Sequence, residues 1–258
     1  MSDALIGHTG FVGGTLLRQR PFDELYNSKN VETIAGKSFG LLAVSAMPAA
    51  KWIANRDPDG DRAVLDRLIG CLRQVAAEQV VVMSTVDVYP TPIDVDEDSP
   101  IDAAAQQTYG RNRLLLERMA AEHFPRLLVV RLPGLFGAGL KKNSIYDLLH
   151  NNEVNKIHAG GMFQFYNLDH LWRDIETALA ARLTLVNFAT EPVSVRDVAR
   201  EAFGLDLTND TGQPPARYDM RSKHAAQFGG RDGYLYSRTQ VLAELQEFVE
   251  GERKGVGR

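Results

Sequence analysis

Residues 4–13, ALIGHTGFVG, decide how this 258-residue chain folds. Three glycines, each three residues from the next, stand between an apolar run at 4–6 and an amphipathic stretch over about 11–20. Glycine permits a sharp strand-to-helix turn and close approach of a pyrophosphate, and the helix N-terminus attracts phosphate. A purely structural turn is the alternative explanation of a glycine triplet. We expect this loop to bind a dinucleotide through Gly7, His8, Thr9, Gly10, Phe11, Val12 and Gly13.

Short apolar runs alternate with amphipathic stretches through the first half of the chain, a pattern typical of β-α-β units and a parallel sheet. The expected strands are 4–6, 24–27, 41–45, 80–83 and 127–132. The expected helices are 11–20, 62–77 and 109–123. The sequence therefore predicts an α/β fold, a Rossmann-like doubly wound parallel sheet with a smaller interleaved C-terminal substrate lobe.

After Pro133 this alternation weakens, which indicates a second lobe. We expect helices over 145–151, 169–181, 193–203 and 238–250, a strand at 183–188, a polar loop region at 213–233 and a frayed tail at 251–258. The predicted dinucleotide-binding domain comprises residues 1–138, with about 169–190 returning to it. Residues 139–168 and 191–258 form the predicted substrate-binding lobe.

Composition and charge exclude several classes of function. Hydrophobic residues make up 44% and charged residues 24%, with 29 basic and 33 acidic side chains and no long run of one sign. We therefore expect no nucleic-acid partner and no membrane surface. Six scattered histidines and the single Cys71 argue against a metal site and an internal disulfide. Because no apolar stretch approaches the ~18 residues of a membrane span and we expect no signal peptide, we predict a cytoplasmic location.

The tip of the second expected strand lacks the acidic residue that binds the ribose of NAD in many dinucleotide folds. It carries Asn27, Ser28 and Lys29 instead. Asn27 would bond the ribose hydroxyls, whereas Ser28 and Lys29 would accept the 2′-phosphate of NADP. A solvated polar turn is an equal alternative. The expected cofactor is therefore NAD or NADP.

Five further segments occur in the order seen in a known family. They are MSTVDVYP at 83–90, YGRNR at 109–113, RLPGLFG at 131–137, FYNLD at 165–169 and VNFATEPVS at 186–194. Together with the glycine loop they resemble the extended short-chain dehydrogenase/reductases, NAD-dependent epimerases and dehydratases of nucleotide sugars. The resemblance spans about residues 4–204. It implies that Thr85 and Tyr109 are catalytic and that Arg113 stands in place of the motif lysine.

The types and spacing of these residues suit proton transfer. Oxidising a sugar alcohol needs a base on the hydroxyl while a hydride leaves for the nicotinamide. An ordinary tyrosine has a pKa near ~10, and a close cation lowers that pKa by about 1–3 units. Since residues i and i+4 share a helix face, we expect Arg113 to favour the Tyr109 phenolate. Thr85 would hydrogen-bond the same substrate oxygen.

Two of these positions have alternative interpretations. A planar guanidinium does not replace a lysine equivalently, and Arg113 with Glu117 would otherwise be an ion pair on a helix surface beside a half-buried Tyr109. Val86 and Asp87 stand where family dehydratases have an Asp-Glu pair, which disfavours 4,6-dehydration. Asp87 is either a substrate-binding residue or an outward-facing residue at the strand end.

The resemblance implies further contacts to cofactor and substrate. On the cofactor side these involve Ser45, Ala46, Ser84 and Pro133, together with Tyr109 and Arg113. On the substrate side they involve Asp87, Gly134, Lys141, Asn143 and Arg221. Arg221 is the candidate for the nucleotide phosphates, although both Lys141 and Arg221 are alternatively solvated surface residues. The aromatic side chains Phe163, Phe165 and Tyr166 either stack on a base or belong to the core.

We therefore predict an NAD(P)-dependent epimerase or keto-reductase acting on a nucleotide-activated sugar, with Tyr109 as the acid/base. The alternative is a catalytically degenerate dinucleotide-binding sensor or assembly protein of the same fold. Arg113, the missing ribose acid and the short segment 27–41 favour that alternative. The family resemblance also suggests a homodimer through the helices expected at 62–77 and 109–123.

Overall fold

The computed structural model describes residues 1–255 and divides the chain into two compact units. Unit 1 contains residues 1–90, 99–132 and 171–186, and unit 2 contains residues 91–98, 133–170 and the chain from 187 onward. The sequence-based division placed 91–98 and 133–138 in the first domain, whereas here they group with unit 2. The binding roles of the two units stay predictions. Within residues 1–255, no helix is long and apolar enough to cross a bilayer.

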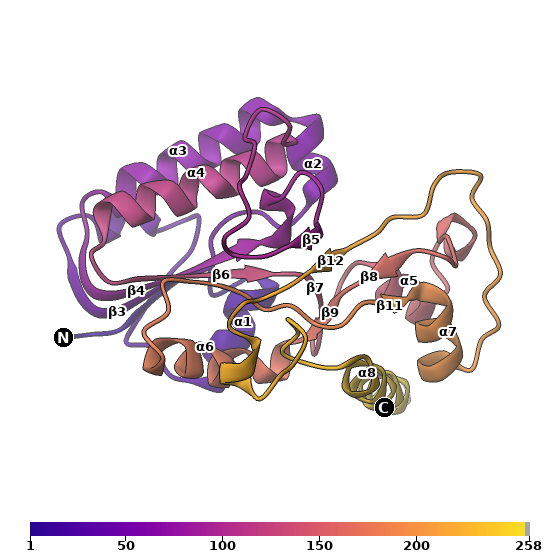
Figure 1. Ribbon diagram of the computed structural model, residues 1–258. Helices are drawn as coiled ribbons and strands as arrows, with labels where there is room; N and C mark the ends of the chain where they lie inside the picture. Colours follow the sequence, from indigo (N-terminus) through magenta and orange to yellow (C-terminus); the bar gives the residue numbers. More distant parts are fainter. Residues whose placement is uncertain (256–258) are drawn as a thin grey trace. The chain divides into compact units, whose positions relative to one another are not determined.

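Unit 1 is built on a six-stranded sheet with the strand order β10-β6-β4-β3-β1-β2 (Figure 1). Its strands are β1 (Ala4–Ile6), β2 (Glu24–Tyr26), β3 (Ser38–Val44), β4 (Ala76–Thr85), β6 (Leu127–Leu132) and β10 (Leu185–Asn187). The pairs from β2 across to β6 are parallel. Strand β6 is buried at every residue, as expected for a parallel strand with helices on both faces. The predicted Rossmann-like α/β fold is confirmed.

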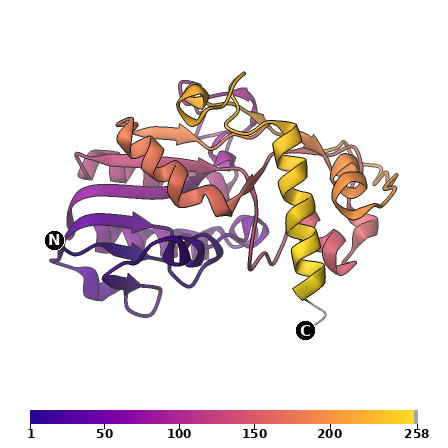
Figure 2. The same cartoon turned by 90° about the horizontal axis from the view of Figure 1, so that it is seen from below.

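Helices cover both faces of this sheet. Helices α3 (Pro58–Leu72) and α4 (Thr108–His123) lie on one face, and α1 (Phe11–Gln19) and α6 (Leu171–Ala180) lie on the other, where Figure 2 shows α6 crossing the strands. Asp57 caps α3 by accepting a hydrogen bond from the Gly60 N–H, so the helix starts four residues earlier than the sequence predicted. It ends at Leu72 because Ala76 already pairs with β3.

The connection between β2 and β3 is unusually short. Residues 27–37 contain only a 3₁₀ turn, Val31–Ile34, and no α-helix. In the usual dinucleotide fold, with strand order 3-2-1-4-5-6, another strand lies beyond the second one. Here β2 is the edge of the sheet. The segment 27–41, which the sequence shows to be short, therefore contains no further β-α crossover.

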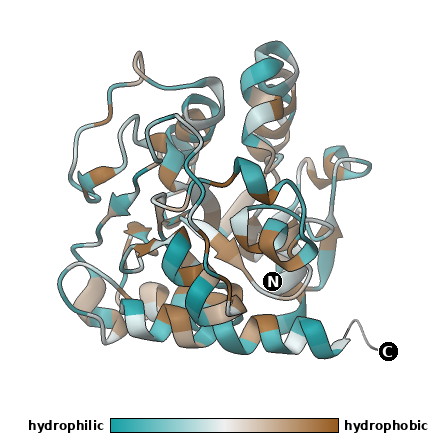
Figure 3. Cartoon of the chain, turned by 90° about the vertical axis from the view of Figure 1, so that its right-hand side faces the viewer, coloured by the Kyte–Doolittle hydropathy of each residue, from teal (hydrophilic) through white to brown (hydrophobic). Residues whose placement is uncertain are grey.

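Unit 2 combines three small two-stranded sheets with helices. The strand pairs are β7 (Gly134–Phe136) with β9 (Phe165–Asn167), β8 (Met162–Phe163) with β11 (Val193–Ser194), and β5 (Ile93–Val95) with β12 (Asp219–Met220). The helices are α5 (Ser144–His150), α7 (Val195–Phe203) and α8 (Arg238–Gly255). Helix α8 buries Val241, Leu245 and Val249, which recur every four residues, and Figure 3 shows its mixed hydropathy.

Parts of unit 2 differ from the sequence-based expectation. The polar loop region 213–233 contains β12 and a 3₁₀ turn at Ala225–Phe228. The last helix continues to Gly255, although we expected fraying from residue 251. The rest of that predicted tail, 256–258, lies outside the described residues.

The glycine loop of unit 1 leaves no room for side chains at two of its glycines. Gly7 has φ +91°, and a Cβ there would lie 2.1 Å from the Ser45 carbonyl oxygen. A Cβ on Gly13 would lie 2.1 Å from the Gly7 carbonyl oxygen. Gly14, the next residue of α1, differs because its Cβ would meet His8 O at an ordinary 3.5 Å. Close backbone packing at the start of α1 therefore depends on Gly13 and not on Gly14.

The neighbouring glycines Gly13 and Gly14 should respond oppositely to alanine. We expect Gly13→Ala to lower the free energy of unfolding by about 1–3 kcal/mol, because the added methyl group overpacks the turn. Gly14→Ala should raise it by roughly 0.5–1 kcal/mol, since alanine is the better helix former. Urea unfolding of the two variants beside the parent protein checks this. Equal effects of the two substitutions would contradict the packing described.

Candidate functional site

The first turn of α1 has the backbone features of an anion-binding site in unit 1. Gly10 is the N-cap of α1 and makes no side-chain cap. The N–H groups of a first helical turn lack intrahelical acceptors and carry positive partial charge. Ser45 and Ala46 lie against Gly7, so the structure brings residues 7–13 together with two further predicted cofactor residues. The Gly7 N–H and the His8 ring both contact the Tyr26 carbonyl oxygen, at 2.8 and 2.9 Å, which holds the loop on β2.

The tip of β2 is a closed polar turn. The Asn27 side-chain oxygen accepts the Lys29 N–H at 2.8 Å, and the Asn27 N–H donates to the Asn30 side chain at 2.7 Å. Ser28 and Lys29 are exposed at the tip. The carboxylate of β2 belongs to Glu24, at the other end of the strand, where it binds Lys37 at 2.6 Å. The tip itself therefore carries no carboxylate that would repel a 2′-phosphate.

The three predicted catalytic residues meet within unit 1. Thr85 ends β4 and Tyr109 lies in the first turn of α4. The Thr85 hydroxyl is close enough to the Tyr109 phenol to lower its pKa. The Arg113 guanidinium carbon lies 3.9 Å from the centre of the Tyr109 ring, in a cation–π contact. Arg113 therefore faces the ring of the tyrosine, as its i+4 position predicted.

Arg113 is buried and hydrogen-bonds to partners within the protein. It is 3% exposed, and its Nη1 donates to Asp61 at 2.6 Å and to the Tyr109 carbonyl oxygen at 3.1 Å. Its Nη2 donates to the Pro48 carbonyl oxygen. The alternative of a surface pair between Arg113 and Glu117 is wrong, because α3 supplies Asp61 as the partner. Removing this guanidinium from Asp61 would leave a buried unpaired charge, which is strongly unfavourable.

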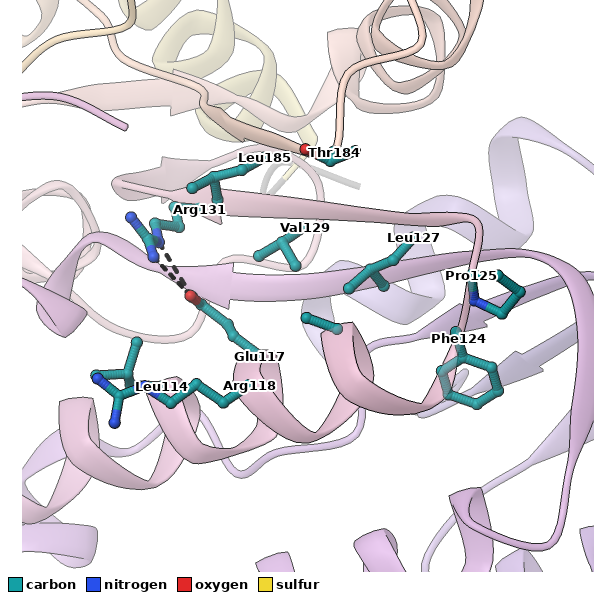
Figure 4. Close-up of a pocket in the computed structure, with 11 residues that line it drawn as sticks. Leu114, Glu117, Arg118, Phe124, Pro125, Leu127, Val129, Arg131, Thr184 and Leu185 are labelled. Carbon is teal, nitrogen blue, oxygen red and sulfur yellow. Dashed lines mark hydrogen bonds and ion pairs between the residues drawn. The ribbon is translucent and has the colours of Figure 1, made fainter. Parts of the chain in front are cut away.

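Glu117 belongs to a second buried network on the same helix. It accepts two hydrogen bonds from Arg131 on β6, at 2.6 and 3.1 Å, and one from the Ser84 hydroxyl. Arg131 also donates to the Tyr89 hydroxyl at 2.7 Å. Figure 4 shows the Arg131–Glu117 pair at a cavity of about 350 Å³ between α4 and β6. The Ser84 hydroxyl, predicted to contact cofactor, thus bonds inside the core.

Burial dominates the acidity of Tyr109. Desolvation raises the pKa of the Tyr109 phenol above its ordinary value, and the Asp87 carboxylate raises it further. The Arg113 cation, the Thr85 hydrogen bond and the Lys51 cation lower it, but they do not compensate for burial. The expected effect of Arg113 is present, because its cation lowers the Tyr109 pKa, but desolvation outweighs it. The net shift of the Tyr109 pKa is upward, towards the neutral phenol.

A short helix beside Tyr109 was not anticipated from the sequence. Helix α2 (Lys51–Arg56) places Lys51 2.8 Å from Asp87, and its Asn55 side chain accepts the Tyr109 N–H at 3.0 Å. Asp57-Pro58 after this segment is a stop signal, but Ala50 before it is a poor N-cap and gives no start signal. Its six residues are too few for a helical hydrophobic pattern, which needs a window of about 11–18 residues.

The predicted substrate residues other than Asp87 lie in unit 2, together with Pro133. Gly134 begins β7 and Lys141 is exposed. Asn143 caps α5 by accepting the N–H groups of Ile145 and Tyr146 at 3.0 and 3.2 Å. Arg221 makes loose ion pairs with Asp94 at 3.4 Å and Asp219 at 3.6 Å.

The aromatic candidates of unit 2 divide between core and surface. Phe165 and Tyr166 are buried, as their alternative interpretation held. Phe163 is half-buried and stacks on Tyr218 with the ring centres 5.5 Å apart. Phe163 is therefore the member of the three that retains exposed surface.

Neither a protein-family model nor a curated protein sequence matches the chain. Solved structures match it closely in fold. TunA, an NAD-dependent NDP-hexosamine 5,6-dehydratase involved in tunicamycin biosynthesis, gives a TM-score of 0.73 at 18% identity over 98% of both chains. MoeE5 in complex with UDP-glucose and NAD gives 0.71 at 21% identity, over 98% of this chain and 99% of that one. A dTDP-4-dehydrorhamnose reductase from Clostridium acetobutylicum gives 0.73 at 16%, over 98% and 100%.

The chain thus has the fold shared by these three proteins. The sequence-based resemblance to extended short-chain dehydrogenase/reductases is confirmed at the level of the fold. The glycine loop, Thr85 and Tyr109 lie together in unit 1, on the elements where the sequence predicted them.

Tyr109 should remain protonated well above neutral pH in the cofactor-free protein. An ordinary tyrosine titrates near ~10, and burial raises the Tyr109 pKa above that value. The check is an ultraviolet titration of tyrosinate absorbance, with the Tyr109→Phe spectrum subtracted. We expect no Tyr109 signal up to about pH 10. A Tyr109 tyrosinate signal at pH 7–8 would overturn this assignment.

Proposed function

We propose that the chain is an NAD(P)-dependent oxidoreductase or epimerase of nucleotide-activated sugars, with Tyr109 as the proton-transferring residue. The observation that carries the proposal is that Thr85, Tyr109 and Arg113 lie in the same unit as the glycine loop, with Arg113 against the Tyr109 ring. The shared fold supports it, because TunA, MoeE5 and the reductase are described as acting on or binding nucleotide sugars. Fold alone does not fix a reaction, so the site carries the argument.

The glycine loop fits the diphosphate of a dinucleotide. Side chains at Gly7 and Gly13 would collide with backbone, so this turn has the compactness that lets phosphate reach main-chain N–H groups. Gly10 leaves the start of α1 without a side-chain cap, so an anion can take that place. When bound, a reduced nicotinamide supplies the hydride that a carbonyl carbon accepts. Asn27, Ser28 and Lys29 would face the adenosine ribose.

Tyr109 is better suited to donate a proton than to remove one. A neutral phenol can protonate the carbonyl oxygen of a keto sugar as the carbon receives hydride, so C=O becomes H–C–O–H. Thr85 would hold the same oxygen, and the resulting phenolate would regain its proton from water. Oxidation of an alcohol requires the phenolate first, which burial opposes. The neutral phenol is the form from which keto-reduction starts, and the phenolate is the form that the reverse oxidation needs.

The substrate phosphates are assigned to Arg221 of unit 2. Its ion pairs with Asp94 and Asp219 are long, and all three side chains are 30% or more exposed. Exposed ion pairs contribute little stability, so a diphosphate can replace these carboxylates. Lys141 is the second proposed cation on this side, and the exposed surface of Phe163 would suit a nucleotide base.

A second candidate function is a dinucleotide-binding protein without turnover. The engagement of Arg113 by Asp61 and Pro48 favours it, because the motif lysine also bonds the nicotinamide ribose in the family that the sequence resembles. This candidate shares the glycine-loop site with the first one. Turnover is what separates them.

Cofactor binding and the Tyr109→Phe variant test the proposal together. The chain has two tryptophans, so Trp172→Phe leaves Trp52 as the single donor for energy transfer to NADH or NADPH. We expect saturable binding that Tyr109→Phe leaves within about twofold. Reduction of UDP- and dTDP-4-keto sugars should fall by roughly 10²–10⁴-fold in Tyr109→Phe.

Three results would go against the enzyme. No binding of either cofactor to folded protein would remove both candidate functions. Binding without turnover on a panel of UDP-, GDP- and dTDP-sugars would favour the second candidate. Equal turnover in Tyr109→Phe would remove the role of Tyr109.

A further inference from the structure

The segment 48–55 contacts the start of α4 and its neighbour Asp87 at three points. The Pro48 carbonyl oxygen accepts from Arg113, Asn55 accepts the Tyr109 N–H, and Lys51 pairs with Asp87. Gln107, the N-cap of α4, makes no side-chain cap, so Asn55 serves a first-turn N–H that has no acceptor within the helix. Asn55 also donates to the Gln107 side chain at 2.6 Å. The position of α2 beside Tyr109 is thus fixed by several independent bonds.

Arg113 is held by buried partners inside the protein. Its guanidinium lies over the Tyr109 ring face and is 2.6 Å from the buried Asp61 carboxylate. That carboxylate also accepts a hydrogen bond from Asn112 at 2.8 Å. Of the charged groups around Tyr109, Arg113 has the largest effect on the phenol pKa and lowers it.

The second ion pair near Tyr109 is different in character. Lys51 and Asp87 are 2.8 Å apart, and their side chains are 42% and 19% exposed. Asp87 lies two residues after Thr85, and its N–H donates to the Thr85 hydroxyl oxygen at 3.2 Å. Exposed pairs with a flexible lysine separate at small cost. Lys51 is therefore a partly exposed cation near Tyr109 that Asp87 holds.

We propose that the Lys51–Asp87 pair adjusts the charge at the Tyr109 hydroxyl, and that helix α2 is for this reason part of the candidate site. Lys51 stabilises the phenolate left after proton transfer, and Asp87 opposes it by holding Lys51 and by its own charge. Both are positioning residues that act through Tyr109. The catalytic meaning of this inference rests on the proposed function, whereas the interaction itself is independent of turnover.

The charged surroundings of Tyr109 come from four elements. Arg113 of α4 and its partner Asp61 of α3 form the buried pair, and Lys51 of α2 and Asp87 after β4 form the exposed one. Lys51 lowers the pKa of the Tyr109 phenol and Asp87 raises it. Removing either member of the exposed pair should therefore shift the phenol titration in opposite directions.

The test is ¹⁹F NMR of the full chain labelled with 3,5-difluorotyrosine, whose more acidic phenol titrates before alkaline unfolding. The Tyr109 resonance is assigned by its loss in Tyr109→Phe. We expect Lys51→Met to raise the Tyr109 midpoint and Asp87→Asn to lower it, each by up to ~1 pH unit or tenfold in the ionisation constant. Lys51→Arg, which keeps the charge, should restore the parent midpoint.

Lys156→Met is the matched control. Lys156 also forms an exposed pair, with Glu153 at 2.5 Å, but in unit 2, so the Tyr109 midpoint should not move. An unchanged midpoint in Lys51→Met, or shifts of the same sign in Lys51→Met and Asp87→Asn, overturns the inference. Opposite shifts in a protein without turnover would support this inference and refute the proposed function, whereas turnover with unmoved midpoints would do the reverse.

Discussion

The buried pair between Arg113 and Asp61 is the interaction on which the proposed site depends. It joins α4 to α3, and through Pro48 it also holds the segment that leads into α2. Forming a buried ion pair costs desolvation free energy. Removing one partner destabilises the fold more, because the other charge is then buried without a partner or water. The Tyr109 ring packs against this guanidinium. Its position therefore depends on the buried bonds that Arg113 makes to Asp61 and Pro48.

This constraint changes the chemistry that the motif suggested. An arginine four residues after a tyrosine predicts a cation at the phenol, yet the geometry puts the cation on the ring face and gives its charge a carboxylate partner. Burial then outweighs the cation and keeps the phenol protonated. A proton-donating tyrosine is consistent with reduction of a keto sugar, and the exposed pair at Lys51 becomes the adjustable charge of the site.

Local patterns predicted those features that depend on neighbours in sequence. Strand β6 begins and ends where the apolar run predicted, and the glycine loop joins β1 to α1 as expected. The pairing of Arg113 was missed because Asp61 lies 52 residues away, and only tertiary structure chooses between it and the nearer Glu117. Helix α2 was missed because one and a half turns carry too little periodicity. The direction of the Tyr109 pKa was missed because burial cannot be read from spacing.

The most direct test of this account is a double-mutant cycle on Asp61→Ala and Arg113→Ala, followed by urea unfolding. If the pair stabilises the site, each single substitution should lower the free energy of unfolding by about 3–5 kcal/mol. The double variant should lower it by far less than the sum of the two single effects. Additive losses of about 1 kcal/mol or less each, as for an exposed pair, would contradict it. The positioning of Tyr109 would then have to come from other contacts.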